Sequence, residues 1–269
     1  MHIVKHIPAL GLGTYKLKTE AEIMNSMSYA IESGYRMFDT AALYKNEHHM
    51  AHFIREDLPK WNLSRDDIWI TTKVAYFTML EGESAIRKSI ENSLKYFSGY
   101  IDLLLIHASN PNDLLTWRIL REYQNAGKVR KIGISNYNVE RLSRFCECIG
   151  EDEVRHIYVN QIEFNPYLNR AELVKMCKMR GIRVIAYGSL YKAGEEVKAI
   201  SEKYNVTCES VLLKWAVQSG CIIIPMSRNE EHIRENWLSV YGEDYTFTSG
   251  EMDTLNMLNE GYTKYQKHL

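Results

Sequence analysis

The sequence predicts an α/β fold, a (β/α)8 TIM barrel formed by one domain over residues 1–269. Short apolar or β-branched segments alternate repeatedly with helical patterns along the chain, which is typical of βα units. Several of these segments are apolar throughout, as in parallel strands that are covered on both faces. The length of 269 residues suits one such barrel, and no Pro-rich or Ser/Gly-rich linker divides the chain.

Eight short segments are predicted to be the barrel strands. A short β-hairpin over residues 2–7 is expected before the first of them. The eight predicted strands are residues 10–13, 36–38, 68–72, 101–106, 131–134, 157–161, 182–186 and 222–224.

The segments between the strands carry signals for helix ends. Thr19 and Glu22 match a capping box, apolar residues then repeat at helical spacing, and Gly34 has the position of a C-terminal stop. Further helices are predicted after Gly82, from Asn169 to Gly181, up to Gly220, and from the Thr248–Glu251 box near the C-terminus.

Composition excludes several classes of partner. A formal net charge of −1 gives no general attraction to nucleic acid or to an anionic membrane. No apolar run approaches the roughly 18 residues that span a bilayer, and the first ten residues do not resemble a signal peptide. The five cysteines are scattered and odd in number, which favours reduced thiols. We therefore expect a cytoplasmic protein, without a nucleic-acid or membrane partner, and a monomer.

Polar or aromatic residues follow the predicted strands at the point where each strand ends. In a (β/α)8 barrel these ends form one face, where functional groups gather. An acid, a lysine and a histidine follow three successive strands, a combination that the ordinary contact of strand ends with water does not explain. The residues at the eight ends are Gly13, Asp39, Lys73, His107, Ser135 with Asn136, Gln161, Tyr187 and Ser227.

Seven segments occur in a characteristic order and spacing. They are GLGTYK (11–16), GYRMFDTAALYKNE (34–47), TTKV (71–74), LLLIH (103–107), KVRKIGISNY (128–137), NQIEFNPYL (160–168) and IPMSRNEEHIREN (224–236). Taken together, they resemble the aldo-keto reductase family over nearly the whole chain. The resemblance implies an enzyme that reduces a small-molecule aldehyde or ketone with hydride from a nicotinamide dinucleotide.

Tyr44, five residues after Asp39, either covers a loop or donates a proton. A carbonyl that accepts hydride develops alkoxide charge, so it needs a proton donor and a polarising group at its oxygen. The ordinary pKa of tyrosine is about 10, and a nearby ammonium lowers it. We hypothesise that Lys73 has this effect on Tyr44 and that Asp39 holds Lys73 charged. His107 would donate a hydrogen bond to the substrate oxygen, and the resemblance implies the same four roles.

The resemblance also implies a cofactor across the barrel mouth, and no G-x-G-x-x-G motif follows a strand here. Tyr187 would stack on the nicotinamide, and polar residues after the fifth and sixth strands would bind its carboxamide. The implied cofactor-binding residues are Gly13, Thr14, Ser135, Asn136, Gln161, Tyr187, Gly188, Leu190, Ser227, Arg228, His232, Glu235 and Asn236.

The phosphate-binding segment after the eighth strand departs from the family pattern. The usual Ile-Pro-Lys-Ser reads Ile-Pro-Met-Ser here, with Met226 in place of the lysine, and His232 replaces a later arginine. These two cations normally bind the 2′-phosphate of NADPH. Arg228 is expected to compensate because a guanidinium suits phosphate. We therefore favour NADP(H), with NAD(H) as a possible cofactor.

The expected substrate pocket is open and only partly apolar. Tyr15 has the position of a pocket aromatic. After His107 the family commonly continues with Trp-Pro, whereas this chain reads ASNP over 108–111, and both the loop to Trp117 and the tail after Tyr262 are short. These differences favour small or polar carbonyl substrates.

Three alternatives are open. A catalytically weak, dinucleotide-binding regulatory protein on the same fold fits the altered phosphate segment. A barrel lyase or aldolase would use Lys73 as a Schiff-base amine, but Asp39 and Tyr44 do not favour it. His48 and His52, four residues apart beside His49, suggest a metal site, yet an exposed helix face explains them better, so no metal is predicted.

Overall fold

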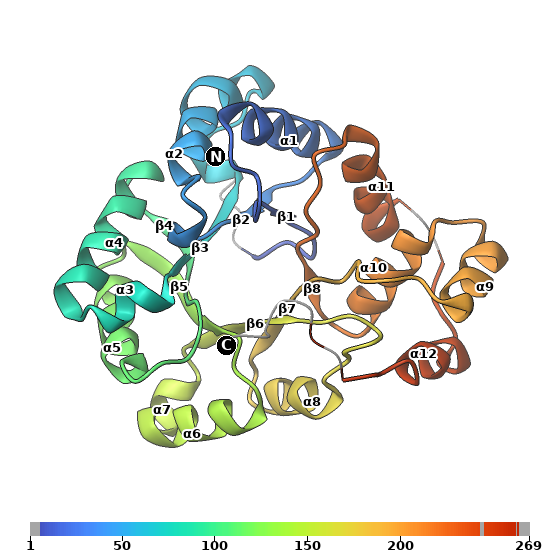
Figure 1. The fold of residues 1–269 in the computed structure, drawn as a ribbon. Helices are drawn as coiled ribbons and strands as arrows, with labels where there is room; N and C mark the ends of the chain where they lie inside the picture. Colours follow the sequence, from blue (N-terminus) through green and yellow to red (C-terminus); the bar gives the residue numbers. More distant parts are fainter. Residues whose placement is uncertain (1–5, 243–244, 262, 264–269) are drawn as a thin grey trace.

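In the computed structural model, which describes residues 6–242, 245–261 and 263, eight parallel strands pair in chain order and helices surround them (Figure 1). The sheet closes between its first and last strands. Leu10 forms a parallel bridge with Ile223, and the Gly11 amide donates to the Ile223 carbonyl at 2.9 Å. The predicted (β/α)8 barrel is therefore confirmed.

The strands agree with the predicted segments to within a few residues. Positions 2–5 of the expected hairpin lie outside the described residues, and His6 and Ile7 are not in a strand. The strands are β1 (Leu12–Gly13), β2 (Met37–Asp39), β3 (Trp69–Val74), β4 (Ile101–Ile106), β5 (Val129–Ser135), β6 (Ile157–Glu163), β7 (Arg183–Tyr187) and β8 (Ile222–Ile223).

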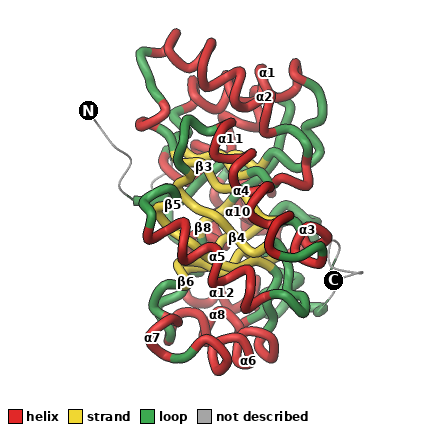
Figure 2. Tube along the Cα trace, turned by 90° about the vertical axis from the view of Figure 1, so that its left-hand side faces the viewer, coloured by secondary structure: helices red, strands yellow, loops and turns green. Residues whose placement is uncertain are grey.

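Helices form a layer around the strands, as the side view in Figure 2 shows. Short 3-10 or π segments lie at η1 (Ala42–Tyr44), η2 (Phe53–Asp57), η3 (Leu58–Trp61) and η4 (Arg65–Asp67). The α-helices are α1 (Glu20–Ser33), α2 (Glu47–His52), α3 (Tyr76–Leu80), α4 (Glu83–Tyr96), α5 (Asp113–Asn125), α6 (Val139–Ile149), α7 (Glu151–Val154), α8 (Ala171–Met179), α9 (Glu195–Tyr204), α10 (Cys208–Gln218), α11 (Glu230–Tyr241) and α12 (Ser249–Asn256).

Local sequence signals set the helix ends. The Glu22 amide donates to Thr19 Oγ1 at 3.2 Å, while the Glu22 carboxylate accepts from the Thr19 amide at 3.0 Å. Gly34 ends α1 with φ at 102°, a left-handed conformation that favours glycine. The second box, at Thr248, also forms and begins α12. Both capping predictions are confirmed.

The barrel interior holds a small apolar cluster of its own, separate from the larger core between strands and helices. Side chains alternate between the two faces of a strand, so every second residue points inward. The interior cluster consists of Met37, Trp69, Leu103, Leu105, Val159, Ile185, Ile222 and Ile224. These residues fill the lower part of the barrel, the part toward the beginning of the strands. The upper part, toward the ends of the strands, is left to the residues that follow them on each strand.

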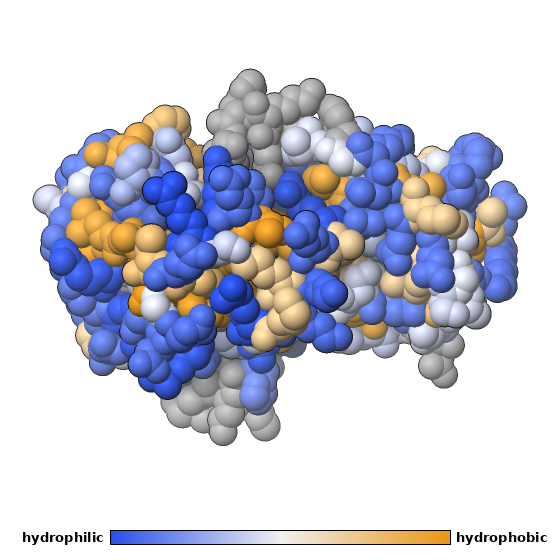
Figure 3. Space-filling view, turned by 90° about the horizontal axis from the view of Figure 1, so that it is seen from below, coloured by the Kyte–Doolittle hydropathy of each residue, from blue (hydrophilic) through white to orange (hydrophobic). Residues whose placement is uncertain are grey.

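The outer surface is predominantly hydrophilic on the side shown in Figure 3, with hydrophobic patches between the polar residues. In the described parts of the chain, no helix combines the length and apolar character needed to cross a bilayer.

Candidate active site

The polar residues predicted at the strand ends continue the inward alternation of the apolar cluster. Two residues after Met37 comes Asp39, and four residues after Trp69 comes Lys73. His107 likewise comes two residues after Leu105. Because residues two or four apart on a strand share a face, the carboxylate, ammonium and imidazole all point into the barrel mouth.

A cavity of about 440 Å³ occupies this mouth. Three of the four residues of the proposed catalytic set line it, and the fourth, Lys73, is buried against Asp39. Its wall is formed by Gly13, Tyr15, Lys16, Asp39, Leu43, Tyr44, His107, Ser135, Asn136, Gln161, Tyr187, Gly188, Ser189, Leu190, Ile224, Pro225 and Met226.

Lys73 and Asp39 form a buried ion pair. Lys73 Nζ lies 2.7 Å from Asp39 Oδ1 and donates a second hydrogen bond, also 2.7 Å long, to the Thr40 carbonyl. Burial lowers the pKa of Lys73, and Asp39 opposes this by stabilising the ammonium. The carboxylate thus contacts the lysine directly and favours its charged form.

Tyr44 lies over this pair. Lys73 Nζ is 5.2 Å from the centre of the Tyr44 ring, within the range of a cation–π contact. The predicted direction of the pKa change is wrong for this structure: burial, followed by the negative charge of Asp39, raises the pKa of Tyr44 well above its ordinary value. Desolvation of the phenolate outweighs the nearby ammonium, and Tyr44 keeps its proton, as a proton donor must.

His107 is a neutral imidazole near neutral pH. Burial, together with the charge of Lys73, lowers its pKa to about 3. Its ring packs edge-on against Tyr44, with 5.8 Å between ring centres. Nδ1 is buried and has no hydrogen-bond partner among the described residues. A neutral histidine that lines the cavity beside Tyr44 can donate a hydrogen bond to a ligand oxygen, the role predicted for it.

Asn46 fixes the loop that carries Tyr44, and the sequence analysis assigned no role to it. Its side-chain nitrogen donates to the carbonyls of Thr14 and Leu17 at 3.1 and 2.9 Å, and its oxygen accepts from Thr40 Oγ1 at 2.7 Å. The side chain is completely buried. Asn46 thus joins the loops after β1 and β2. Its two carbonyl partners lie about 30 residues earlier in the chain, so no local sequence signal identifies this role.

The residues after β5, β6 and β7 form a connected hydrogen-bond network in the cavity wall. Tyr187 Oη donates to Asn136 Oδ1 at 2.8 Å, and Asn136 Nδ2 donates to the His107 carbonyl at 2.9 Å. Gln161 Nε2 donates to Asp39 Oδ2 at 2.7 Å, and Ser135 Oγ donates to the Gln161 carbonyl at 2.9 Å. An aromatic ring and two amides therefore stand beside the buried ion pair.

This wall fits a nicotinamide dinucleotide. Tyr187 offers a ring face, and Asn136 and Gln161 offer the amide chemistry that a carboxamide needs. Next to them, Gly188 has φ at 66°, and Ser189 Oγ is buried with no hydrogen-bond partner among the described residues. An unpaired buried hydroxyl in the cavity wall is the kind of group that a bound ligand satisfies.

Two other predicted cofactor-binding residues, Gly13 and Thr14, have structural roles. A Cβ atom on Gly13 would lie 2.7 Å from the Ile224 carbonyl oxygen, so glycine is required where β1 approaches the end of β8. Thr14 is fully buried, and its hydroxyl donates to the Asp39 carbonyl at 3.0 Å. Gly13 also lines the cavity, whereas Thr14 is not among its lining residues.

The segment after β8 leaves the cavity at Met226. Ser227 accepts from the Asn229 amide within its own loop. Arg228 is already engaged: its Nε lies 2.6 Å from Glu22 Oε1, and Nη2 donates to the Lys16 carbonyl. The cation expected to compensate for Met226 is therefore held by a carboxylate of α1 in this structure.

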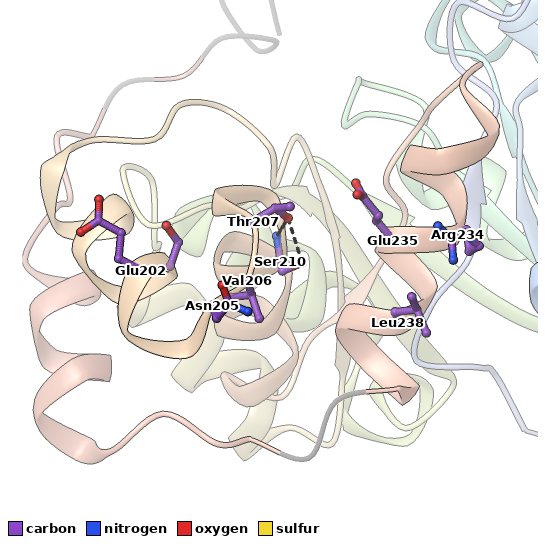
Figure 4. A pocket seen from close by; sticks show the side chains of 9 residues that line it. Glu202, Asn205, Val206, Thr207, Ser210, Arg234, Glu235 and Leu238 are labelled. Atoms are coloured by element: carbon purple, nitrogen blue, oxygen red, sulfur yellow. Dashed lines mark hydrogen bonds between the residues drawn. The ribbon is translucent and has the colours of Figure 1, made fainter.

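A second cavity, of about 500 Å³, lies where the end of α9 and the start of α10 face α11 (Figure 4). Glu235 and Arg234 approach it from α11, and Thr207 and Ser210 from the start of α10. The structure thus places Glu235 in this separate cavity. Of the other two predicted residues of α11, His232 is exposed and Asn236 is buried.

Tyr15 and Leu43 flank the opening of the first cavity. Both side chains are about half exposed, and the Tyr15 ring lies 5.2 Å from that of Tyr44. The segment after His107 does not reach the cavity wall. Instead, Asn110 Nδ2 donates to the Tyr76 carbonyl at 3.0 Å, which ties this segment to α3. The final residues of the tail, 262 and 264–269, lie outside the described residues.

The histidines of α2 lie close together. The His48 and His49 rings are 3.8 Å apart, and His52 Nδ1 lies 3.0 Å from Glu20 Oε1. In the part of the chain that the structure describes, no group of three or more potential ligands is arranged to hold a metal ion.

Comparisons with known proteins agree with this geometry. The model of the Aldo/keto reductase family matches residues 9–193. The chain is 34% identical over 266 residues to the glyoxal reductase of Bacillus subtilis (strain 168), covering 97% of this chain and 92% of that protein. It is 35% identical over 242 residues to the methylglyoxal reductase DkgB of Salmonella typhi, covering 87% of each. The crystal structure of MGS-M4, an aldo-keto reductase enzyme from a Medee basin deep-sea metagenome library, superimposes with a TM-score of 0.86 at 29% identity, covering 96% of this chain and 93% of that one.

Proposed function

The chain belongs to the aldo/keto reductase family, and we propose that it is an NAD(P)H-dependent reductase of small or polar carbonyl compounds, with Tyr44 as the general acid. One observation carries the proposal. Tyr44 and His107 face one cavity, directly above the buried Lys73–Asp39 pair. This is the arrangement that a carbonyl oxygen needs when it becomes an alkoxide.

In the proposed reaction the substrate oxygen lies between Tyr44 and His107. A reduced nicotinamide dinucleotide, when bound along the wall of Asn136, Gln161 and Tyr187, supplies the hydride. Tyr44 donates its proton to the developing alkoxide, and Lys73 stabilises the phenolate that remains. Neutral His107 donates a hydrogen bond that orients the carbonyl. The low polarity of the site strengthens each of these interactions.

Small dicarbonyls are the proposed substrate class. The cavity opens between Tyr15 and Leu43, and the segment after His107 adds no aromatic wall to it. The curated relatives whose names specify glyoxal and methylglyoxal reduction support the same class.

For the cofactor we propose NADPH, with NADH also accepted. Arg228 lies within the altered phosphate segment, two residues after Met226, but Glu22 already pairs with it. Binding of a 2′-phosphate would have to compete with this pair, so the preference for NADPH over NADH is expected to be weak.

The test is dinucleotide oxidation, followed by absorbance, across a panel of carbonyls with NADPH and with NADH. We expect turnover with methylglyoxal and other small dicarbonyls, and less than about a tenfold difference in kcat/KM between the two cofactors. Tight dinucleotide binding without oxidation on any carbonyl would contradict the proposal and favour the regulatory alternative. Turnover that is fastest with steroid ketones would contradict the proposed substrate class but not the reductase function.

A further inference from the structure

A second buried carboxylate lies close to the proposed catalytic residues and has no part in the proposed reaction. Glu47 begins α2, three residues after Tyr44, and its side chain is only 6% exposed. Thr72 Oγ1 donates to Glu47 Oε1 at 2.6 Å. Ser93 Oγ donates to the same oxygen at 2.9 Å and lies 3.1 Å from Oε2. Hydroxyl donors of this kind favour the ionised carboxylate.

The position of Thr72 shows which side of the barrel wall Glu47 occupies. Thr72 precedes Lys73 on β3, so the two side chains leave opposite faces of the strand. Lys73 points into the barrel mouth, and Thr72 points outward, toward α2 and the Ser93 hydroxyl of α4. Glu47 therefore lies on the outer side of the strand that carries Lys73, opposite the side on which Asp39 contacts the ammonium.

The charges around Glu47 are few. Of the elements packed on it, β3 brings Lys73 and the Thr72 hydroxyl, and α4 brings the Ser93 hydroxyl. Glu20 of α1 also faces α2, but it pairs with His52. Burial raises the pKa of Glu47, and Thr72, Ser93 and Lys73 oppose that change. The same coupling acts on the lysine: Asp39, and then Glu47, counteract the effect of burial on the pKa of Lys73.

We propose that Glu47 is a second counter-ion of Lys73, a positioning residue that acts through the wall of β3 to keep the ammonium charged beneath Tyr44. One carboxylate in direct contact and one behind the strand then stabilise a single buried cation. In a low-polarity interior, a charge that does not touch the ammonium still acts on it strongly. The kinetic consequence rests on the proposed reductase function, whereas the coupling between the two charges does not.

The test measures the protonation of Lys73 directly. Protein labelled with ¹³C-lysine is titrated by NMR as the full chain, and the Lys73 resonance is assigned with Lys73→Met. Glu47→Gln keeps the shape of the side chain and removes its charge. We expect the titration midpoint of Lys73 to fall by about one pH unit, the usual effect of losing a nearby opposite charge. In the pH profile of kcat/KM, the midpoint of the decline at alkaline pH should also fall by about one pH unit.

Glu153→Gln is the matched control. Glu153 also accepts bonds from two side chains, Trp117 Nε1 at 3.0 Å and Arg121 Nε at 2.9 Å, but it belongs to α7 in the outer helix layer. This variant should leave the Lys73 midpoint and the midpoint of the alkaline decline in place. Should Glu47→Gln fail to fold, Glu47→Met removes the same charge with a side chain of similar size and should give the same shift.

An unchanged Lys73 midpoint in a folded Glu47 variant would overturn the proposal and leave Glu47 as a purely structural residue. A lowered midpoint in a protein that turns over no carbonyl would support the charge coupling and contradict the reductase function. The two claims can therefore fail separately.

Discussion

Burial sets the charges of the proposed catalytic residues as much as their neighbours do. The side chains of Lys73 and Asp39 are 1% and 3% exposed, so neither charge is stabilised by water. Their 2.7 Å contact and the bond from Gln161 to the second carboxylate oxygen replace that solvation. Tyr44 and His107, which are partly buried in the cavity wall, stay neutral instead. An ion pair beneath two neutral donors suits a reaction that creates negative charge on a carbonyl oxygen.

His107 makes the protein sensitive to acid. Its pKa of about 3 in the folded protein lies below the ordinary value of 6.5, so the unfolded chain binds a proton first. Stability is therefore unaffected above pH 6.5 and falls as the pH drops from 6.5 toward 3. At pH 5 the expected loss is about 2 kcal/mol. Urea unfolding of the wild type and of His107→Asn at pH 7 and pH 5 measures it. Equal losses in both proteins would show that another group is responsible.

At the scale of elements, the loops after β1 and β2 form one unit that holds Tyr44. Asn46 connects them through hydrogen bonds to the Thr14 and Leu17 carbonyls and from the Thr40 hydroxyl. Asn46→Ala takes the bonding partner from two buried groups, the Leu17 carbonyl and the Thr40 hydroxyl, whereas the Thr14 carbonyl still accepts from the Leu17 amide. We expect this change to cost about 3 kcal/mol of unfolding free energy. The loss of loop order should also lower kcat.

Chemical denaturation and steady-state kinetics of Asn46→Ala check both effects. Thr248→Ala, which removes the cap of α12 on the outer layer, is the control and should cost about 1 kcal/mol without an effect on kcat. A stable Asn46→Ala protein with normal turnover would show that the two loops hold their shape independently.

Elements with local signals were predictable, and contacts between distant elements were not. The box at Thr19 and the stop at Gly34 depend on residues of one helix, and both predictions are confirmed. The inward alternation from Trp69 to Lys73 follows from strand geometry alone. By contrast, the Glu22–Arg228 pair joins residues 206 positions apart, and nothing in either segment predicts the other.

At the scale of the whole molecule, the barrel separates stability from chemistry. Its lower interior is apolar, its upper interior carries the polar residues, and both come from the same strands in alternation. The upward shift in the pKa of Tyr44 was not predictable because it depends on burial by several strands at once. Placement of Glu235 in a second cavity likewise depends on how α10 and α11 pack. The monomeric state stays a prediction.

The central claim is that Tyr44 supplies the proton for carbonyl reduction above a buried lysine–aspartate pair. Tyr44→Phe removes one hydroxyl group and keeps the ring that packs against Tyr15 and His107. The direct measurement is the rate of NADPH oxidation with methylglyoxal, together with the Kd of NADPH from protein fluorescence. We predict that kcat falls by about a thousandfold in Tyr44→Phe while the Kd of NADPH changes less than about twofold. A variant that turns over at the wild-type rate would contradict the claim.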